Sequence, residues 1–482
     1  MNEYAMCHRS ESHRPRFHFT PRQNWMNDPN GLVCYDGEYH LFYQHNPYGK
    51  EWGHMSWGHA FSRNLVHWKD LSVAILEEPE NTFTIFSGSA VVDWRNTSGF
   101  GQAARPPLVA VYTADHQPRE ALQDIHIAYS IDRGRTFNKY AGNPVLDVGD
   151  RKFGDPKVFW HEETARWIMV NIRGRGQGRA VLYGSNDLKR WEFLSEFRAP
   201  RQAPGTWECP DLFPLPLDGR PEQIKWVLKA NCVGGETGRR ASRYFVGDFD
   251  GQRFRNEILG GRALWPDRGD IYAEVTWNDI PKSDGRRILI GWIPQRPSET
   301  RPWTGMQSIP RVLTLRSTAE GVRLCQAPIA ELRVLRSEHT AFGSETISGD
   351  PVSLAERGSS GSELEIVAQF EPNSASEFGL QIELEAGKEA FVGYSVASGE
   401  LYVHQRGGRN RLVAPLRVGN HPLKLHLFLD RSVLEVFGGN GEAVITALLD
   451  PGSVCEGVSV YARDGVARLV KMDAWRMAPV WT

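Results

Sequence analysis

The uniform shortness of the apolar runs constrains the fold more than any other feature. Nearly every run is rich in β-branched or aromatic residues and is bounded by Gly, Pro, Asn or Asp, as in LVAVYTAD, RWIMVNIR and RRILIGWI. No long segment sustains the periodicity of a helix. Short runs separated by turn residues are typical of β-sheet proteins. The sequence therefore predicts an all-β fold.

A degenerate repeat organises the first part of the chain. In each copy a strand-like run ends in an Asn or Asp turn, followed by a basic residue and then by an aromatic residue that opens the next run. The markers are Asn64, Asp132, Asp187 and Asp248, which lie 68, 55 and 61 residues apart. Such steps suit a four-stranded propeller blade with long loops. With the strand-like runs of residues 271–315 the repeat predicts five blades; chance similarity of β-turns is the competing interpretation.

A change in composition divides the chain. Its 482 residues are too many for one compact core. Residues 340–362 are rich in Gly and Ser, and beyond them lie alternating runs such as SELEIVAQF and LKLHLFLDRSVLEVFGG. That alternation is typical of a β-sandwich. We predict a five-bladed β-propeller over residues 14–335, followed by a C-terminal β-sandwich over residues 336–482.

Charge and cysteine content exclude several classes of protein. The net charge is −2 and both signs are interspersed, which argues against a nucleic-acid or membrane partner. The six cysteines show no metal-ligand spacing, so we expect free thiols and neither a metal nor a cofactor. No apolar run has the length of a transmembrane helix or the character of a signal-peptide core. We therefore expect a cytoplasmic protein, with its oligomeric state left open.

Three carboxylates stand in similar local contexts. Asp28 lies in NWMNDPNG, Asp155 in KFGDPKVFW and Glu208 in TWECPDLFP. Taken singly, each could be a turn or capping carboxylate, since Asp-Pro-Asn-Gly is strong turn chemistry. Taken together, one in each of three blades, they would meet at the central funnel of a propeller. Because a retaining glycosidase needs a nucleophilic carboxylate and a carboxylic acid about 5 Å apart, the set favours glycoside cleavage.

The motifs NWMNDPNG, FSGSAVVDWRNTSGFG, DPKVFW, WECPDLFPL and RRILIGW resemble glycoside hydrolase family 32, the β-fructosidases: invertases, exo-inulinases and levanases. The resemblance runs from about Phe17 to Leu315 and resumes at LFLDRSVLEVFGG. It implies a five-bladed propeller followed by a sandwich. It also implies release of terminal β-D-fructofuranosyl units from sucrose, fructo-oligosaccharides or fructans such as inulin and levan. By the same resemblance, Asp28 would be the nucleophile, Glu208 the acid/base and Asp155 the transition-state stabiliser.

The resemblance further implies a set of sugar-binding positions. These are Trp25, Asn27, Gln44, Trp52, Phe86, Ser87, Gly154, Asp270 and Trp303. Gln44 could instead satisfy buried backbone groups, and Trp52 and Trp303 could be packing residues. Cys209 would tune the surroundings of the neighbouring acid.

The sequence departs from the family pattern at Gly154, where an Arg usually precedes Asp-Pro. Three explanations compete. A nearby cation (Arg151, Lys152, Arg173 or Arg175) replaces the Arg, or the pocket accepts a different fructoside, or the protein is a weakly active or inactive fructan-binding homologue. A transfructosylase is a further alternative, because the covalent intermediate can pass to a sugar hydroxyl. An arabinan-cleaving propeller would share the architecture, but the WMNDPNG and WECPDLF pair favours fructosyl substrates. The linkage, β-2,1 or β-2,6, is left open.

Overall fold

The structure is a computed structural model that describes most of the chain. The described residues are 9, 11, 14–78, 83–102, 105–116, 122–176, 178–198, 205–234, 240–257, 264–295, 297–298, 301–354, 361–407, 411–419, 421–449 and 455–481. Their regular secondary structure is almost entirely strand, with two short 3₁₀ helices, η2 (Ala330–Leu335) and η4 (Glu385–Gly387), so the predicted all-β class is confirmed. Over these same ranges, no helix has the length and apolar character needed to span a bilayer.

The chain forms two compact units. The propeller unit comprises Pro21–Trp265 and Tyr272–Val322, and the sandwich unit comprises Met1–Thr20, Pro266–Ile271 and Arg323–Thr482. The sequence assigned residues 14–20, 266–271 and 323–335 to the propeller, whereas their contacts group them with the sandwich unit.

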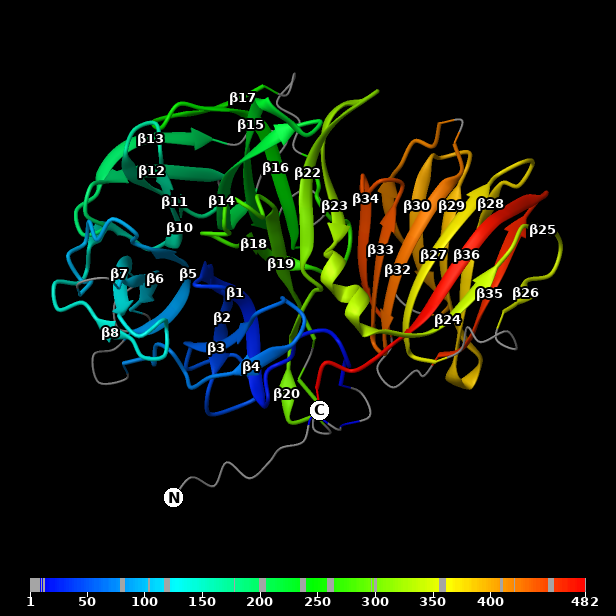
Figure 1. Cartoon of the computed structure of the whole chain (residues 1–482), viewed down its shortest axis with the longest axis horizontal. Coiled ribbons are helices and arrows are strands. Elements are labelled where there is room, and N and C mark those ends of the chain that lie inside the picture. Colours follow the sequence, from blue (N-terminus) through cyan, green and yellow to red (C-terminus); the bar gives the residue numbers. More distant parts are fainter. Residues whose placement is uncertain are drawn as a thin grey trace. The chain divides into compact units, whose positions relative to one another are not determined.

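The propeller unit contains the five blades that the sequence predicted, arranged around a centre (Figure 1). The first three blades are separate antiparallel sheets. Blade I is β1 (Asn24–Tyr35), β2 (Glu38–Asn46), β3 (Ser56–Ser62) and β4 (Trp68–Asp70), with β20 (Trp303–Thr304) parallel to β1. Blade II is β5 (Thr84–Val92), β6 (Leu108–Asp115), β7 (Gln123–Ser130) and β8 (Asn138–Lys139), with β9 (Leu146–Asp150) on β7. Blade III is β10 (Phe153–His161), β11 (Arg166–Arg173), β12 (Arg179–Ser185) and β13 (Glu192–Arg198).

The last two blades share a sheet, because β14 and β22 pair at one residue. Blade IV is β14 (Thr206–Leu217), β15 (Arg220–Val233), β16 (Ala241–Phe249) and β17 (Phe254–Asn256). Blade V includes β18 (Tyr272–Thr276), β19 (Arg287–Ile293) and β22 (Arg311–Thr318), with β21 (Met306–Gln307) on β19. β23 (Gly321–Pro328) follows β22 and spans the division between the units.

Three of the four repeat markers lie in the turn between the third and fourth strands of a blade. Asn64, Asp132 and Asp187 each accept a hydrogen bond from a serine hydroxyl two residues earlier. The fourth marker was placed two residues early. Asp248 lies within β16, and Asp250 makes the turn by accepting the N–H groups of residues 252 and 253 at 2.9 and 2.7 Å. The repeat is therefore a capped turn, which the side-chain oxygen stabilises locally.

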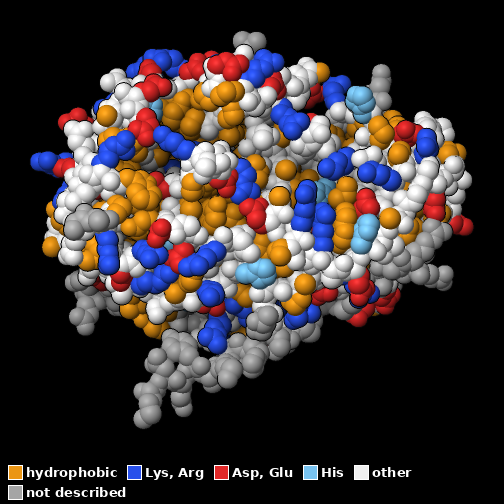
Figure 2. Space-filling view, in the orientation of Figure 1, with side chains coloured by type: hydrophobic (Ala, Val, Ile, Leu, Met, Phe, Trp, Pro, Cys, Tyr) orange, Lys and Arg blue, Asp and Glu red, His pale blue; other side chains and the backbone are white. Residues whose placement is uncertain are grey.

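The sandwich unit consists of two antiparallel sheets. One sheet has the order β24 (Arg336–Phe342), β36 (Ala467–Met477), β27 (Glu363–Glu371), β32 (Leu423–Asp430), β33 (Val433–Gly438) and β34 (Ala443–Leu448), with β25 (Glu345–Ile347) on β36. The other has the order β26 (Val352–Ser353), β35 (Cys455–Arg463), β28 (Glu377–Leu384), β29 (Lys388–Ser395), β30 (Glu400–Gln405) and β31 (Leu412–Pro415). Alternate residues of β27 and β28, such as Ile366 and Leu380, fill one apolar core. Acidic and basic side chains are interspersed over the visible surface (Figure 2).

Candidate active site

The inner strand of every blade carries a β-bulge near its beginning. The pairing register slips between Met26 and Pro29 in β1, Ile85 and Gly88 in β5, Gly154 and Lys157 in β10, Glu208 and Asp211 in β14, and Tyr272 and Val275 in β18. A bulge turns a side chain out of the regular alternation of its strand. Three bulged residues, Asp155, Cys209 and Ala273, have φ values of 54°, 44° and 53°, in the left-handed region. Such backbone costs about 1–3 kcal/mol per residue and is typical of functional sites.

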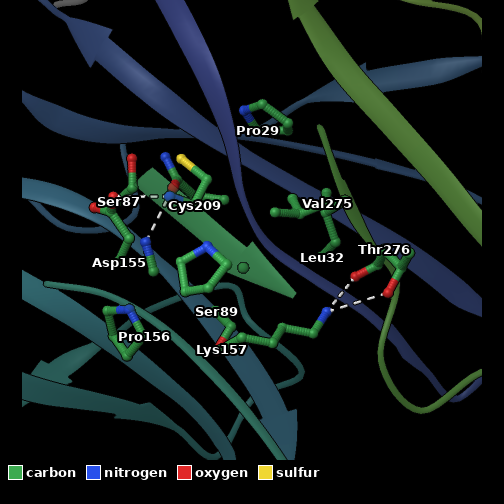
Figure 3. Close-up of a pocket in the computed structure, with 14 residues that line it drawn as sticks. Pro29, Leu32, Ser87, Ser89, Asp155, Pro156, Lys157, Cys209, Val275 and Thr276 are labelled. Atoms are coloured by element: carbon green, nitrogen blue, oxygen red, sulfur yellow. Dashed lines mark hydrogen bonds between the residues drawn. The ribbon is translucent and has the colours of Figure 1, made fainter. Parts of the chain in front are cut away.

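The bulges of β1, β10 and β14 bring the three predicted carboxylates together around Cys209. The Cys209 backbone N–H donates to Asp155 Oδ2 at 2.9 Å, and its thiol donates to Asp28 Oδ2 at 3.4 Å. Glu208 is the preceding residue, and all three carboxylates are partly exposed. Figure 3 shows Asp155 beside Cys209 and Ser87, while Lys157 points the other way, toward Thr276.

Asp28 is held by donors from three blades, the Cys209 thiol being one of them. Ser87 Oγ donates to its Oδ2 at 2.8 Å, and Asn27 Nδ2 donates to its Oδ1 at 3.1 Å. Asn27 is itself fixed by Trp25, whose indole N–H donates to Asn27 Oδ1 at 2.6 Å. Burial raises the pKa of Asp28, while the hydrogen bonds from Asn27 and Ser87 oppose that rise. These donors fix the orientation of a carboxylate that is aimed into the cluster.

Asp155 and Glu208 share a cation. Lys152 Nζ donates to Glu208 Oε1 at 3.0 Å, and the Tyr272 hydroxyl donates to Glu208 Oε2 at 2.8 Å. Burial raises the pKa of Asp155 to about 6; Lys152 lowers it and the Glu208 charge adds to the rise. Burial alone would lower the pKa of Lys152, but Asp155 and Glu208 raise it, so Lys152 stays charged. Burial and the Glu208 charge raise the pKa of Tyr272 well above its usual value, so Tyr272 stays a donor.

Cys209 serves as a donor rather than a nucleophile. Burial, followed by the charges of Asp28, Asp155 and Glu208, raises the pKa of its thiol well above the usual value. A protonated thiol is a weak nucleophile but can donate to a carboxylate. The sequence expected Cys209 to tune the surroundings of the acid, and its contacts with Asp28 and Asp155 extend that role to both other carboxylates.

Several predicted sugar-binding residues lie around the carboxylates. Trp25, Asn27 and Ser87 contact one another or Asp28, as described above. Phe86 packs against the Trp52 ring edge-on at a centroid distance of 6.1 Å, and Trp52 is 59% exposed, as a sugar platform requires. The sugar contacts of these residues stay predictions.

Three other predicted residues have structural partners. Gln44 is buried and donates to the backbone carbonyl of Ile85 at 3.0 Å, just before Phe86. Trp303 is fully buried in β20, beside β1. Asp270 belongs to the sandwich unit, where its carboxylate accepts the N–H of Leu448 at 3.1 Å. A role for Asp270 in sugar binding has no support from these contacts and stays a prediction.

Gly154 has a steric reason to be glycine. A Cβ at this position would lie 2.6 Å from Thr113 Oγ1 and 2.8 Å from Thr113 Cγ2. Thr113 Oγ1 also accepts the N–H of Asp155 at 2.8 Å. Any side chain at Gly154, an Arg included, would therefore displace the residue that positions the Asp155 backbone.

The four cations named from the sequence differ in position. Lys152 reaches the carboxylates, while Arg173 Nε pairs with Asp150 at 3.0 Å, and Arg151 and Arg175 are exposed. Sequence reasoning did not find Tyr272 or Thr113. The nearest signal was the run GDIYAEVTW, from which Asp270 was chosen instead of Tyr272.

A propeller whose bulged inner strands gather three carboxylates and one lysine defines a glycoside hydrolase. Residues 18–328 match the model described as "Glycosyl hydrolases family 32 N-terminal domain", and residues 331–476 match "Glycosyl hydrolases family 32 C terminal". The chain belongs to glycosyl hydrolase family 32.

Curated relatives and solved structures agree with this assignment. A levanase of Bacillus subtilis is 44% identical over 491 residues, covering 98% of this chain and 71% of the relative. An extracellular exo-inulinase of Aspergillus ficuum is 35% identical over 518 residues, covering 98% of this chain and 96% of the relative. The exo-inulinase of Aspergillus awamori superimposes with a TM-score of 0.88 at 33% identity, covering 98% of this chain and 99% of that structure.

Proposed function

We propose that the chain is a retaining exo-β-fructosidase that releases terminal β-D-fructofuranosyl units from sucrose, fructo-oligosaccharides or fructans. The arrangement of Asp28, Asp155 and Glu208 around Cys209 carries the proposal, because it supplies the carboxyl pair that retaining cleavage needs. The similarity to levanases and exo-inulinases supports fructans, and hydrolysis over transfer.

The contacts suit a two-step reaction. Asp28 attacks the anomeric carbon and forms a covalent ester, as the glycosidic C–O bond breaks and Glu208 gives its proton to the leaving oxygen. Glu208 then takes a proton from water, whose oxygen attacks the same carbon, and Asp28 leaves with free fructose as product. Ionised Asp155 accepts hydrogen bonds from ring hydroxyls. Tyr272 and Lys152 orient Glu208 throughout.

Lys152 supports the first explanation for the missing Arg: a neighbouring cation takes its place. The lysine reaches the carboxylates from two residues before Gly154, and Thr113 occupies the space that a side chain at Gly154 would need. With the three carboxylates in place, this arrangement favours an active enzyme over an inactive fructan-binding homologue. The cytoplasmic location stays a prediction.

The test is a product profile on sucrose, kestose, inulin and levan. Free fructose as the main early product is the expected result, and the relative rates identify the preferred linkage. Asp28→Asn should lower kcat by about 10⁴-fold or more, as loss of a covalent nucleophile does in other enzymes. Asp36→Asn is the matched control, because Asp36 is a turn aspartate with positive φ and an exposed ion pair with Arg133. Longer fructo-oligosaccharides as the main product, or unchanged fructose release by Asp28→Asn, would contradict the proposal.

A further inference from the structure

Two histidines and an aspartate converge at one end of blade II, outside the carboxylate cluster. His116 directly follows β6, and Asp124 and His126 lie on β7. Residues two apart on a strand share a face, so Asp124 and His126 point the same way. Asp124 pairs with Ala114 and His126 with Tyr112, so His116, two residues beyond Ala114, lies diagonally across from Asp124.

Both imidazoles lie close to the same carboxylate oxygen, Asp124 Oδ1. His116 Nε2 lies 3.1 Å from Asp124 Oδ1, and His126 Nε2 lies 3.0 Å from that same atom. One ligand atom from each of the three residues lies within 4.8 Å of the others. His116 Nε2 makes a hydrogen bond with Asp124 Oδ1, whereas His126 Nε2 is buried, equally close to that oxygen and without a hydrogen-bond partner. The approach of His126 without a hydrogen bond is what a ligand of a shared ion shows.

The surroundings are apolar and enclosed. The Phe83 ring lies 5.3 Å from the His116 ring and 5.0 Å from the His126 ring, between centroids. The Tyr112 ring lies 5.8 Å from His126 on another side. Side-chain exposure is 18% for His116, 9% for His126 and 6% for Asp124, so the cluster opens toward solvent at His116.

We propose that His116, Asp124 and His126 form a binding site for a zinc-class divalent cation. Zinc takes imidazole nitrogen and carboxylate oxygen at about 2.0–2.2 Å, so neighbouring ligands of a tetrahedral site lie about 3.3 Å apart. The observed separations of 3.1 and 3.0 Å fit two such edges. Two nitrogen donors disfavour calcium and magnesium, which prefer all-oxygen sites. The fourth ligand is water, entering at the exposed side of His116.

The role of this ion is structural, and the inference does not depend on the proposed function. Gln123, beside Asp124, donates to Asp115 Oδ1 at 2.9 Å and accepts the N–H of Phe153 at 3.1 Å. Phe153 begins the strand that carries Asp155. The ion therefore clamps the β6–β7 hairpin and, through Gln123, braces the beginning of β10.

The test is zinc titration of the full chain, purified without a polyhistidine tag and stripped with a chelator. Calorimetry should show one zinc ion per chain, with a rise in melting temperature, and X-ray absorption should show two imidazoles and one carboxylate. His116→Gln should weaken binding by more than the roughly 10–100-fold that loss of a second-shell group costs. His339→Gln is the matched control, because His339 pairs with the single carboxylate of Asp473 at 2.9 Å.

His116 is the preferred position for the variant, since it lies at a strand end and its loss leaves the blade intact. Asp124→Asn, which keeps the shape of the side chain, gives a second variant with the same expected loss. Absence of zinc binding to the parent chain, or equal affinity in His116→Gln and the parent, would overturn the inference.

Discussion

The two units each contain a cluster of carboxylates around one cation, and the clusters differ in burial and in how fully the cation balances the carboxylate charges. In the sandwich unit, Asp430 accepts the backbone N–H groups of Arg16, Phe17 and His18 at 2.6, 2.9 and 2.9 Å. The His18 ring lies 2.8 Å from Asp430 and 2.9 Å from Glu435, with all three side chains fully buried. This cluster ties the N-terminal segment to β32 and β33.

The carboxylate cluster of the propeller unit is short of positive charge. Lys152 is the cation beside Asp155 and Glu208 there, and the pKa values of Asp28 and Asp155 are raised. In the sandwich unit burial would lower the pKa of His18, but its bonds to Asp430 and Glu435 raise it to about 9. A cluster built for stability satisfies its charges, while one built for chemistry leaves groups poised to exchange protons.

The sharpest test of this contrast replaces Glu208. Glu208→Gln should lower kcat on fructans by about 10³-fold or more, because the acid and base are both lost. It should leave the melting temperature unchanged or higher, since one crowded negative charge disappears. Kinetics and thermal unfolding of the same preparation measure both effects. A large fall in stability would show that Glu208 has a stabilising role, like that of Asp430, instead.

Asp430→Asn should have the opposite profile. Removing one partner of a buried ion pair costs up to about 3–5 kcal/mol. His18 keeps Glu435, but the three backbone N–H groups that Asp430 accepts lose a charged acceptor. Denaturant unfolding should therefore show a large loss of stability. The kcat of the protein that remains folded should be close to that of the parent. Equal stability of variant and parent would show that the cluster around His18 does not stabilise the sandwich unit.

The His18 cluster should also make stability depend on pH. Its folded-state pKa of about 9 exceeds the ordinary 6.5, so the folded protein binds the proton more tightly. The contribution is complete below pH 6.5 and is lost as pH rises through 9, and it amounts to about 3 kcal/mol. Unfolding measured at pH 6, 7.5 and 9 should show this decline. His18→Gln should flatten it, and an equally steep decline in that variant would assign the effect elsewhere.

Lys152→Met should shift the pH profile of activity. Asp155 must be ionised to accept sugar hydroxyls, so kcat/KM should fall as pH drops below about 6. Lys152 lowers that pKa, and its loss should move the acid limb to higher pH, with a several-fold loss of activity at pH 6. Lys152→Arg should restore most of the profile.

Lys225→Met is the control for this experiment. Lys225 also pairs with two acidic side chains, Asp248 and Glu257, but these are not part of the catalytic cluster. If the acid limb of the kcat/KM profile does not move in Lys152→Met, then Lys152 does not control the pKa of Asp155.

Gly154→Ala should have the smallest effect, of about 1–3 kcal/mol on stability, as overpacking usually costs. Its methyl group displaces Thr113 and with it the Asp155 backbone, so KM should rise several-fold. Adding Thr113→Ser removes the methyl contact and frees the hydroxyl to rotate, and should recover part of both losses. Additive losses in the double variant would show that the two residues do not interact.

Local patterns in the sequence were enough to predict the five blades, the sandwich and the three carboxylates. Alternation, capped turns and the motifs around Asp28, Asp155 and Glu208 are each contained within a few residues. Long-range contacts could not be predicted. The N-terminal segment joins the sandwich unit through Asp430, more than 400 residues away in sequence, and Tyr272 reaches Glu208 only because β18 lies beside β14. The cysteine pattern argued against a metal site, and it carried no information about His116, Asp124 and His126.

The inner-strand bulges have a consequence for how this enzyme can diversify. Each bulge interrupts the pairing of its strand over a few residues, and regular pairing resumes beyond it. Substituting a bulged residue that faces the centre therefore does not shift the pairing register of its own strand. The strands of the other four blades are unaffected as well. Each bulge therefore presents its side chains independently of the other four. Substrate preference can be altered by substitutions in one blade at a time.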